Sequence, residues 1–395
     1  MTVQLDIEHP FTWEEHATRI ARTREKMQEQ ALDMLLVTSL HSIYYLFGID
    51  RVASAGVFQG VLLSLDRPPV AVVWTYWDIL FAQSPLIGEI RTWVRDYDEA
   101  AEVLAQTFSE FPKATRVGVE ISDSAVPPRT HMRVVEKLRA QGAQIVDASD
   151  LVTRLRVVKS PTEVLCMRRA AELLDIHFEA AFAAMKPGAR ESDAAGAAIN
   201  ATYSAGGEHC IFPPLMTTGI NTLHRTIHSP SRRRFKPGEL IVLEAGAAFQ
   251  RYHVVGAHTV VCGAKPTTEQ RGHYAMARAR IDLALSLIGP GVPIAKIAKA
   301  MAEQFGATDV EGNLDVEGNM AYTTGIGCGD IWYEGWTIKE TDEWILEPGT
   351  VISLFGASEK PDEYLVLCTD PVLITDSGHE PLTKLKRADL RVVGT

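Results

Sequence analysis

The sequence predicts an α+β protein of two domains, and three observations support this. The chain has 395 residues, more than a single hydrophobic core usually serves. Its first part alternates strand-like and helix-like segments, whereas its second part contains two helix–turn–helix patterns, each followed by a strand-rich, glycine-rich stretch. With 46% apolar and 23% charged residues, the composition is that of an ordinary globular protein. We expect domains at residues 1–154 and 155–395.

The first domain is predicted to be an α/β unit. Residues 12–33 have helical periodicity and begin with Thr12-x-x-Glu15, a pattern typical of a capping box. The segments that follow are strands at 34–40, within 57–77, at 116–120 and at 144–148, with helices near 98–111 and 127–141. Strands that alternate with helices in this way predict an α/β domain.

A strong helix start marks the entry to the second domain. Ser160, Pro161 and Glu163 combine an N-cap hydroxyl, a first-turn proline and a reciprocal carboxylate, which predicts a helix over 161–184. Residues 178–207 and 281–307 then share one pattern, in which an apolar helix, a Pro-Gly turn and an amphipathic helix follow one another. A diverged repeat and independent occurrence of a common motif both explain this. Two related halves would enclose a cleft for a ligand.

Charge and composition exclude several classes of protein. The formal charge of −11 argues against a nucleic-acid surface or an anionic membrane partner. The basic run 232–234 is interpreted as a solvated turn, with an anion contact as the alternative. Five scattered cysteines without CxxC spacing indicate reduced thiols, and Cys328 is expected to be a buried thiol. Without a signal-like segment or a long apolar run, we expect a cytoplasmic protein that acts on a small molecule.

The candidate catalytic group is Glu244, within the segment IVLEAGAAFQRYHVVGAHTVV at 241–261. A carboxylate on an apolar strand is costly unless it is paired or used, and desolvation there should raise its pKa. Glu244 could attack an electrophilic carbon or act as a base for water. The alternative is a structural glutamate that bridges a backbone donor or Arg251.

Histidines and a tyrosine supply candidate proton carriers. His228 precedes a proline turn and is a candidate acid for a leaving nitrogen, with a surface-loop role as the alternative. His253 and His258 lie five residues apart on an extended segment, so their side chains should point to opposite faces. We favour His258 as catalytic, and place His253 and Tyr252 among the substrate-binding residues, with packing as the alternative for His253.

A glycine-rich turn precedes a second group of candidates. The segment TTGIGCG is followed by Asp330, Trp332, Tyr333 and Glu334, and its glycines allow close approach of the backbone to a ligand. An aromatic face there could hold an amidinium or another cation. An aromatic cluster that closes the core or a dimer seam explains the same residues.

Several motifs together resemble the pita-bread superfamily of creatinase, aminopeptidase P, prolidase and methionine aminopeptidase. They are RLRVVKSPTEVLCMRRAAELLD, PGARESDAAGAA, TTGINTLHRTIHSPSRRRFKPGELIVLEAG, LEPGTVISL and DPVLIT, in the order that the family has. The resemblance spans essentially the whole chain. It implies a pita-bread catalytic domain preceded by a creatinase-type α/β domain.

Most of that superfamily holds two divalent metals with two Asp, one His and two Glu. The resemblance puts Glu244 at the first Asp, Val255 at the second and Thr324 at the His. Phe355 replaces the first Glu, and Thr369 or its neighbour Asp370 stands at the last. Valine and phenylalanine offer no ligand atom, so we expect no dinuclear site and no cofactor. Thr324 and Phe355 would then line the cleft as substrate-binding residues, with space filling as the alternative for Thr324.

Two relatives that this resemblance brings in, creatinase and ectoine hydrolase, work without metal. Creatinase relies on a His that maps onto His228 and on Glu residues at positions that Ala257 and Phe355 occupy here, which argues against a faithful creatinase. Ectoine hydrolase has a Glu at the position of Glu244, in a stretch similar to EAGAAFQRYH. The resemblance thus implies a metal-independent hydrolase of a non-peptide C–N bond, such as that of a cyclic amidine.

Other functions and a cross-subunit contribution stay open at this point. The alternatives are a metal-free lyase or creatinase-like amidinohydrolase, and a non-catalytic pita-bread binding protein. Relatives pair so that the N-terminal domain of one subunit caps the cleft of the other. A homodimer of this kind would let Tyr44, Tyr45 or Arg51 complete the partner's site, with packing at a strand end as the alternative.

Overall fold

The computed structural model describes residues 8–50, 57–122, 126–224, 228–305, 321–328, 331–337, 344–385 and 388–395. The chain divides into two compact units, the first formed by Met1–Arg156 together with Cys328–Asp330 and the second by Val157–Gly327 and Ile331–Thr395. The division falls two residues beyond the predicted boundary at 154/155. No helix in the described part of the chain is long and apolar enough to cross a membrane.

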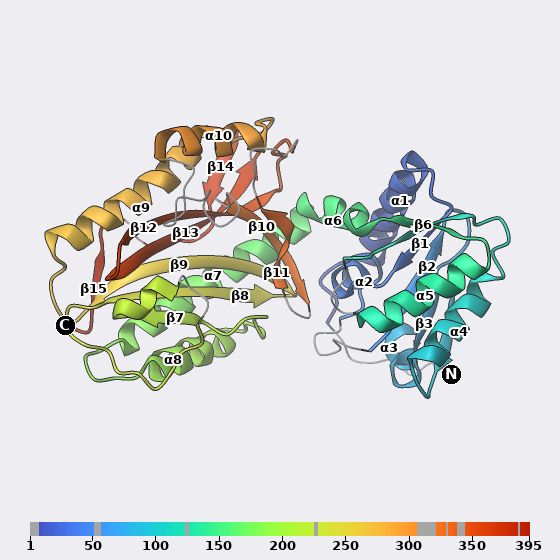
Figure 1. Cartoon of the computed structure of the whole chain (residues 1–395), viewed down its shortest axis with the longest axis horizontal. Coiled ribbons are helices and arrows are strands. Elements are labelled where there is room, and N and C mark those ends of the chain that lie inside the picture. Colours follow the sequence, from blue (N-terminus) through green and yellow to red (C-terminus); the bar gives the residue numbers. More distant parts are fainter. Residues whose placement is uncertain are drawn as a thin grey trace. The chain divides into compact units, whose positions relative to one another are not determined.

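The first unit is built around a six-stranded mixed sheet (Figure 1). Its strands, in spatial order, are β4 (Glu89–Trp93), β3 (Val70–Trp74), β2 (Gly60–Ser64), β1 (Met34–Val37), β5 (Arg116–Val119) and β6 (Gln144–Asp147). The helices are α1 (Trp13–Glu29), α2 (Leu40–Phe47), η1 (Thr75–Trp77), α3 (Asp78–Phe81), α4 (Tyr97–Phe108), α5 (Pro128–Ala140) and α6 (Ser149–Val157). The alternation of strands and helices that the sequence predicts is present.

Helix α2 was not predicted, and a distant carboxylate explains its position. The N-cap Ser39 makes no side-chain capping bond. Instead, Glu120 at the end of β5 accepts the backbone N–H groups of Thr38 and Ser39, at 2.7 and 2.8 Å, and the hydroxyl of Ser42 at 2.5 Å. A carboxylate at a helix N-terminus satisfies free N–H groups and complements the helix dipole.

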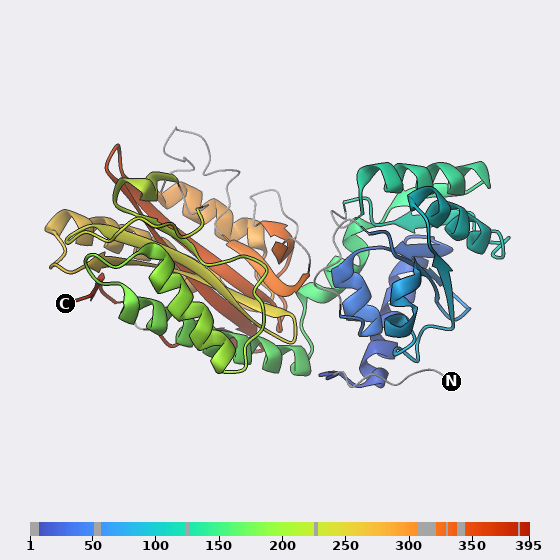
Figure 2. The same ribbon diagram turned by 90° about the horizontal axis from the view of Figure 1, so that it is seen from below.

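The second unit contains one large, mostly antiparallel sheet, nine-stranded within the described residues (Figures 1 and 2). Its main path runs β11 (Ile331–Thr337), β10 (Ala321–Cys328), β12 (Val351–Lys360), β13 (Tyr364–Thr375), β9 (Tyr252–Cys262), β8 (Leu240–Phe249) and β7 (Leu215–Thr218). Strands β14 (Gly378–Pro381) and β15 (Arg391–Val393) pair with β13 and β9. The short helix η2 (Gly219–His224) follows β7.

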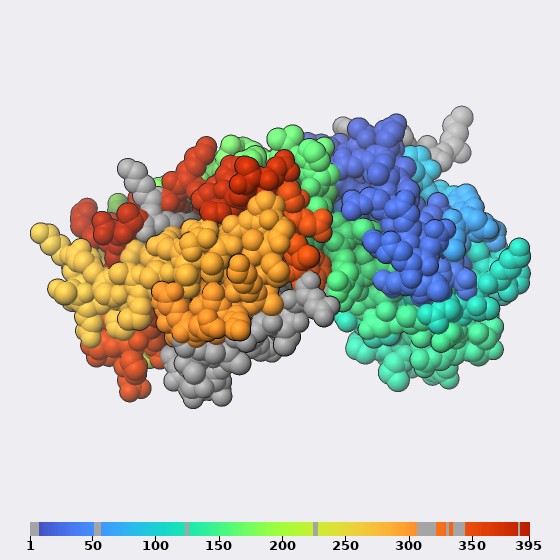
Figure 3. Space-filling model, turned by 90° about the horizontal axis from the view of Figure 1, so that it is seen from above, coloured from blue at the N-terminus to red at the C-terminus, as the bar shows by residue number. Residues whose placement is uncertain are grey.

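Two helix pairs accompany this sheet, as the repeated pattern predicts. They are α7 (Pro161–Ala184) with α8 (Glu191–Ser204), and α9 (Thr268–Leu287) with α10 (Ile294–Phe305). Helix α7 packs on β8 and β9, whereas α9 packs on β12 and β13. The outer surfaces of α9 and α10, in yellow to orange, are visible in Figure 3. One face of the sheet is therefore covered by helices.

The predicted start of α7 is confirmed in detail. The hydroxyl of Ser160 accepts the N–H of Glu163 at 3.2 Å, and the carboxylate of Glu163 accepts the N–H of Ser160 at 2.8 Å. This reciprocal arrangement satisfies two N–H groups that would otherwise lack partners, which explains why the helix begins at Pro161.

Candidate functional site

The register of β8 and β9 decides which side chains share a face with Glu244. Glu244 lies opposite Ala257, and Gly246 lies opposite Val255. Because side chains alternate along a strand and paired residues point the same way, these four positions share one face. That face is opposite to the one on which α7 packs. Glu244 is buried, with 6% of its surface exposed.

His258 and Tyr252 lie on the other face of the sheet. The ring of His258 packs against Phe178 of α7, with centroids 4.5 Å apart. The hydroxyl of Tyr252 donates to the buried carboxylate of Glu163 at 2.7 Å, at the start of α7. The structure therefore does not bring either side chain together with Glu244, and both contribute to packing of the helix on the sheet.

We call the face that carries Glu244 the open face, because α7 and α9 pack on the other one. It continues from β9 onto β13 and β12. Thr369 pairs with Ala257, and Phe355 pairs with Thr369, so both extend the surface that carries Glu244. Asp370 points the other way and forms an ion pair with Arg278 of α9 at 2.8 Å. Of the two candidates for the last ligand position, Thr369 is thus the residue on the open face.

Tyr322 of β10 contacts the candidate carboxylate directly. Its hydroxyl donates to Glu244 Oε1 at 3.5 Å, and the indole N–H of Trp332 donates to Tyr322 Oη. Burial, followed by the negative charge of Glu244, raises the pKa of Tyr322 well above its usual value. The phenol therefore stays protonated and serves as a hydrogen-bond donor to the carboxylate.

Aromatic rings surround this contact. The ring of Tyr322 lies 5.0 Å from that of Phe355 and 5.6 Å from that of Tyr333. Trp332 is buried and meets Phe212 edge to face, with centroids 4.8 Å apart. Of the predicted substrate-binding residues, Trp332, Tyr333 and Phe355 thus lie with Glu244 around Tyr322.

A glycine on β8 makes room for two of these neighbours. A Cβ at Gly246 would lie 2.9 Å from Cys210 Sγ and 3.0 Å from the ring of Trp332. Burial raises the pKa of the Cys210 thiol to about 12, so it remains protonated. Cys210 and Trp332 therefore pack against the backbone of β8 at Gly246, two residues from Glu244.

His253 shares the face of Glu244 but is occupied by backbone partners. Its Nδ1 lies 2.9 Å from the carbonyl oxygen of Arg251, and its Nε2 accepts the N–H of Ile211 at 3.3 Å. These partners assign the proton to Nδ1. Burial is the main cause that lowers the pKa of His253 to about 4. The ring is neutral and holds the end of the β8–β9 hairpin.

The hairpin turn itself has an unusual backbone. Gln250 and Arg251 both have positive φ, at 50° and 64°. The carboxylate of Glu208 accepts both of their N–H groups, at 2.7 and 3.1 Å, and also forms an ion pair with the guanidinium of Arg251 at 3.0 Å. Glu208 thereby stabilises a two-residue turn that neither residue type favours by itself.

The remaining candidates on the predicted glycine-rich segment have different surroundings. Glu334 is buried and forms an ion pair with Lys159, at 2.6 Å. Thr324 is fully buried, and its Oγ1 has no hydrogen-bond partner among the residues that the structure describes. The hydroxyl of Thr369 is buried and equally without a partner there. Asp330 lies outside the described residues.

The structure also places the candidate proton donor His228 and the candidates of the first unit. His228 is exposed, and its Nδ1 lies 2.8 Å from the carbonyl oxygen of Ser229. In the first unit, Tyr44 and Tyr45 are buried, with 4% and 1% of their surface exposed. Arg51 lies outside the described residues.

The side chains at the expected ligand positions do not fit a dinuclear metal centre. Glu244 supplies a carboxylate, Val255 and Phe355 supply no donor atom, and Thr324 and Thr369 supply neutral hydroxyls. Divalent cations of this kind need several carboxylate or imidazole ligands. Across the described ranges, no three His, Cys, Asp or Glu side chains are grouped so as to hold a metal.

Tyr322 and Cys210 were not identified from the sequence. A signal for Tyr322 existed, because it lies two residues from Thr324 on a strand-like segment, and alternate residues of a strand share a face. Cys210 lies in an irregular stretch between α8 and β7, where no periodicity indicates which way a side chain points.

Comparisons with known proteins agree with this architecture. Residues 165–376 match the model of metallopeptidase family M24, and residues 19–158 match that of the creatinase/prolidase N-terminal domain. The crystal structure of prolidase from Thermococcus sibiricus superposes with a TM-score of 0.81 at 18% identity, covering 96% of this chain and 99% of that chain. Dipeptidase PepE from Mycobacterium ulcerans gives 0.79 at 21% identity, covering 97% and 99%.

Relatives with different activities match over almost their whole length. An uncharacterized hydrolase/peptidase from Sinorhizobium fredii is 29% identical, covering 95% of this chain and 97% of the relative. Ectoine hydrolase from Halomonas elongata is 26% identical, covering 97% and 98%. Xaa-Pro dipeptidase from Pyrococcus furiosus is 24% identical, covering 93% and 98%. The chain therefore belongs to metallopeptidase family M24, as a hydrolase with the pita-bread fold and a creatinase/prolidase N-terminal domain.

Proposed function

We propose that the protein is a metal-independent hydrolase that cleaves a non-peptide C–N bond in a small polar compound, such as a cyclic amidine. The observation that carries this is the donor set of the open face. Of the five expected ligand positions, Glu244 alone bears a carboxylate, and it is buried there beside Tyr322. The similarity to ectoine hydrolase over 97% of the chain supports the same chemistry.

Glu244 fits either of two roles in such a reaction. As a nucleophile, its carboxylate oxygen bonds to the amidine carbon and the C–N bond breaks, while the leaving nitrogen takes a proton. Water then hydrolyses the resulting acyl imidate, a mixed anhydride, to an amide and the regenerated carboxylate. As a base, it removes a proton from water, which attacks the same carbon. His228, exposed in the second unit, is the proposed proton donor to the leaving nitrogen. His258 and Tyr252 are not part of this proposal, because they face α7.

The surroundings of Glu244 suit a flat, delocalised cation. The rings of Tyr333 and Phe355 lie 5.6 and 5.0 Å from the ring of Tyr322, and aromatic faces attract cations. The protonated phenol of Tyr322 donates a hydrogen bond to the carboxylate of Glu244. A buried carboxylate beside aromatic rings would recognise an amidinium by charge and by shape.

The test compares hydrolysis by chelator-treated protein across cyclic amidines, small zwitterions and Xaa-Pro dipeptides. We expect amidine hydrolysis to survive chelation and to fall about 100-fold or more in Glu244→Gln, which keeps the side-chain volume but removes the basic oxygen. Tyr322→Phe should lower the rate less. Glu380→Gln, on the partly exposed ion pair with Arg168, is the matched control and should retain activity.

The outcomes separate the candidate functions. Activity that disappears on chelation and returns with a divalent metal would contradict the proposal, as would full activity in Glu244→Gln. Dipeptide hydrolysis would indicate the peptidase activity named for several relatives. A substrate-derived adduct on Glu244, detected by mass spectrometry, would identify it as a nucleophile, whereas incorporation of labelled water without an adduct would identify it as a base.

A further inference from the structure

A buried ion pair joins the entry of the second unit to the strands that carry the site. Lys159 Nζ lies 2.6 Å from Glu334 Oε2, and their side chains are 0% and 1% exposed. Lys159 Nζ also donates to the carbonyl oxygen of Val157 at 3.0 Å, and Glu334 Oε1 accepts the N–H of Ile326 at 3.3 Å. The pair thus connects three segments, namely strand β10, strand β11 and the residues that precede α7.

The backbone around Lys159 provides a fixed base for this pair. The N–H of Lys159 donates to the carbonyl oxygen of Gly349 at 3.1 Å, and Val158 forms an antiparallel bridge with Thr350. Gly349 has φ of +93°, and a Cβ there would lie 2.6 Å from the carbonyl oxygen of Lys159. The capping box of α7 begins at the next residue, Ser160. The pairing with residues 349–350 and the start of α7 therefore fix the backbone of Lys159.

The other end of the pair lies within the strands that line the site. Glu334 is two residues from Trp332 on β11, and Ile326 is four residues from Tyr322 on β10. Gly325 leaves the space that the carboxylate occupies, because a Cβ there would lie 2.4 Å from Glu334 Oε1. A chain of hydrogen bonds runs from Trp332 through Tyr322 to Glu244.

A buried ion pair adds little net stability but demands one geometry, since desolvation of both charges offsets their attraction unless the contact is close. We propose that Lys159 and Glu334 are positioning residues, and that their ion pair sets the place of β10 and β11 so that Trp332 and Tyr322 reach Glu244. This deepens the proposed function, because it assigns Glu334 to the support of the site rather than to substrate binding.

The test uses the apolar double variant Lys159→Met/Glu334→Leu, with Glu334→Gln as a second variant that preserves shape. The protein is labelled with 5-fluorotryptophan, and the resonance of Trp332 is identified by its loss in Trp332→Phe. We expect the double variant to keep its thermal midpoint within a few degrees. The Trp332 resonance should shift or broaden in both variants, and kcat should fall about 10- to 100-fold with a smaller change in KM.

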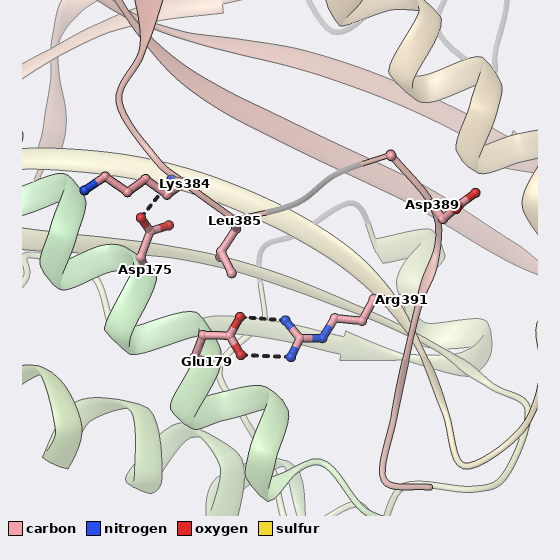
Figure 4. Close-up of a pocket in the computed structure, with 7 residues that line it drawn as sticks. Asp175, Glu179, Lys384, Leu385, Asp389 and Arg391 are labelled. Carbon is pink, nitrogen blue, oxygen red and sulfur yellow. Dashed lines mark hydrogen bonds and ion pairs between the residues drawn. The ribbon is translucent and has the colours of Figure 1, made fainter.

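The matched control is the ion pair between Glu179 and Arg391, on the side of α7 shown in Figure 4. Its two hydrogen bonds are 2.8 Å long, and the side chains are about half exposed. Glu179→Gln/Arg391→Met should leave the Trp332 resonance unchanged.

A wild-type Trp332 resonance in Glu334→Gln, or in a folded double variant, would overturn the inference. An equal shift of that resonance in the Glu179/Arg391 control would also overturn it. The resonance needs no substrate. A shift in a protein that hydrolyses no amidine would therefore support the positioning role while contradicting the proposed function.

Discussion

His253 should lower the stability of the second unit as the pH falls, and His253→Gln should remove this dependence. Its pKa is lowered from 6.5 to about 4, mainly by burial, so the unfolded chain binds a proton that the folded chain rejects. The stability that this group contributes is fully present above about pH 6.5 and is lost as the pH falls toward about 4. Protonation would also turn Nε2 into a donor facing the N–H of Ile211.

The magnitude follows from the two pKa values. Between about pH 7 and pH 4.5, linkage gives a loss of about 2 kcal/mol from this histidine alone. Urea unfolding at both pH values, compared between wild type and His253→Gln, isolates that contribution, because His16 and His177 have similarly lowered pKa values in both proteins. His379→Gln on β14 is the control. A wild type and His253→Gln variant that lose equal stability would refute the reasoning.

Two further substitutions test the packing on either face of the sheet. Gly246→Ala should destabilise the protein by about 1–3 kcal/mol in urea unfolding and lower kcat/KM, because the new methyl group displaces Trp332. Adding Cys210→Ala should restore part of the stability and of kcat/KM. An unchanged kcat/KM in Gly246→Ala would contradict the contact with Trp332. Arg278→Met should cost about 3–5 kcal/mol, because it removes the guanidinium that pairs with the Asp370 carboxylate, whose side chain is only 7% exposed. Arg278→Met/Asp370→Leu should regain most of this stability, and equal losses in the two variants would contradict the prediction.

Local signals in the sequence were sufficient for several elements of the fold. Helix α7 begins where Ser160, Pro161 and Glu163 predict it, because a capping box depends only on residues close in sequence. Helix α2 could not be found in this way, since its N-terminus is satisfied by Glu120, far along the chain. Contacts within a segment could thus be predicted from the sequence, whereas contacts between distant segments could not.

The candidate site shows the same limit. Alternation correctly separated His253 from His258, but which of them shares the face of Glu244 depends on the length of the turn at Gln250 and Arg251. The hydrogen bond from Tyr322 and the ion pair of Lys159 join residues whose proximity arises only when the strands assemble. No pattern within either segment encodes those contacts.

The turn at Gln250 and Arg251 determines which histidine of β9 shares the sheet face of Glu244. The side chains of β9 alternate between the two faces, so a slip of one residue against β8 would place Val255 and Ala257 on the face that packs on α7 and His258 on the face of Glu244. Glu208, which lies on neither strand, blocks that slip by clasping the bend. A residue outside both strands thus keeps the His258 imidazole off the face that carries Glu244.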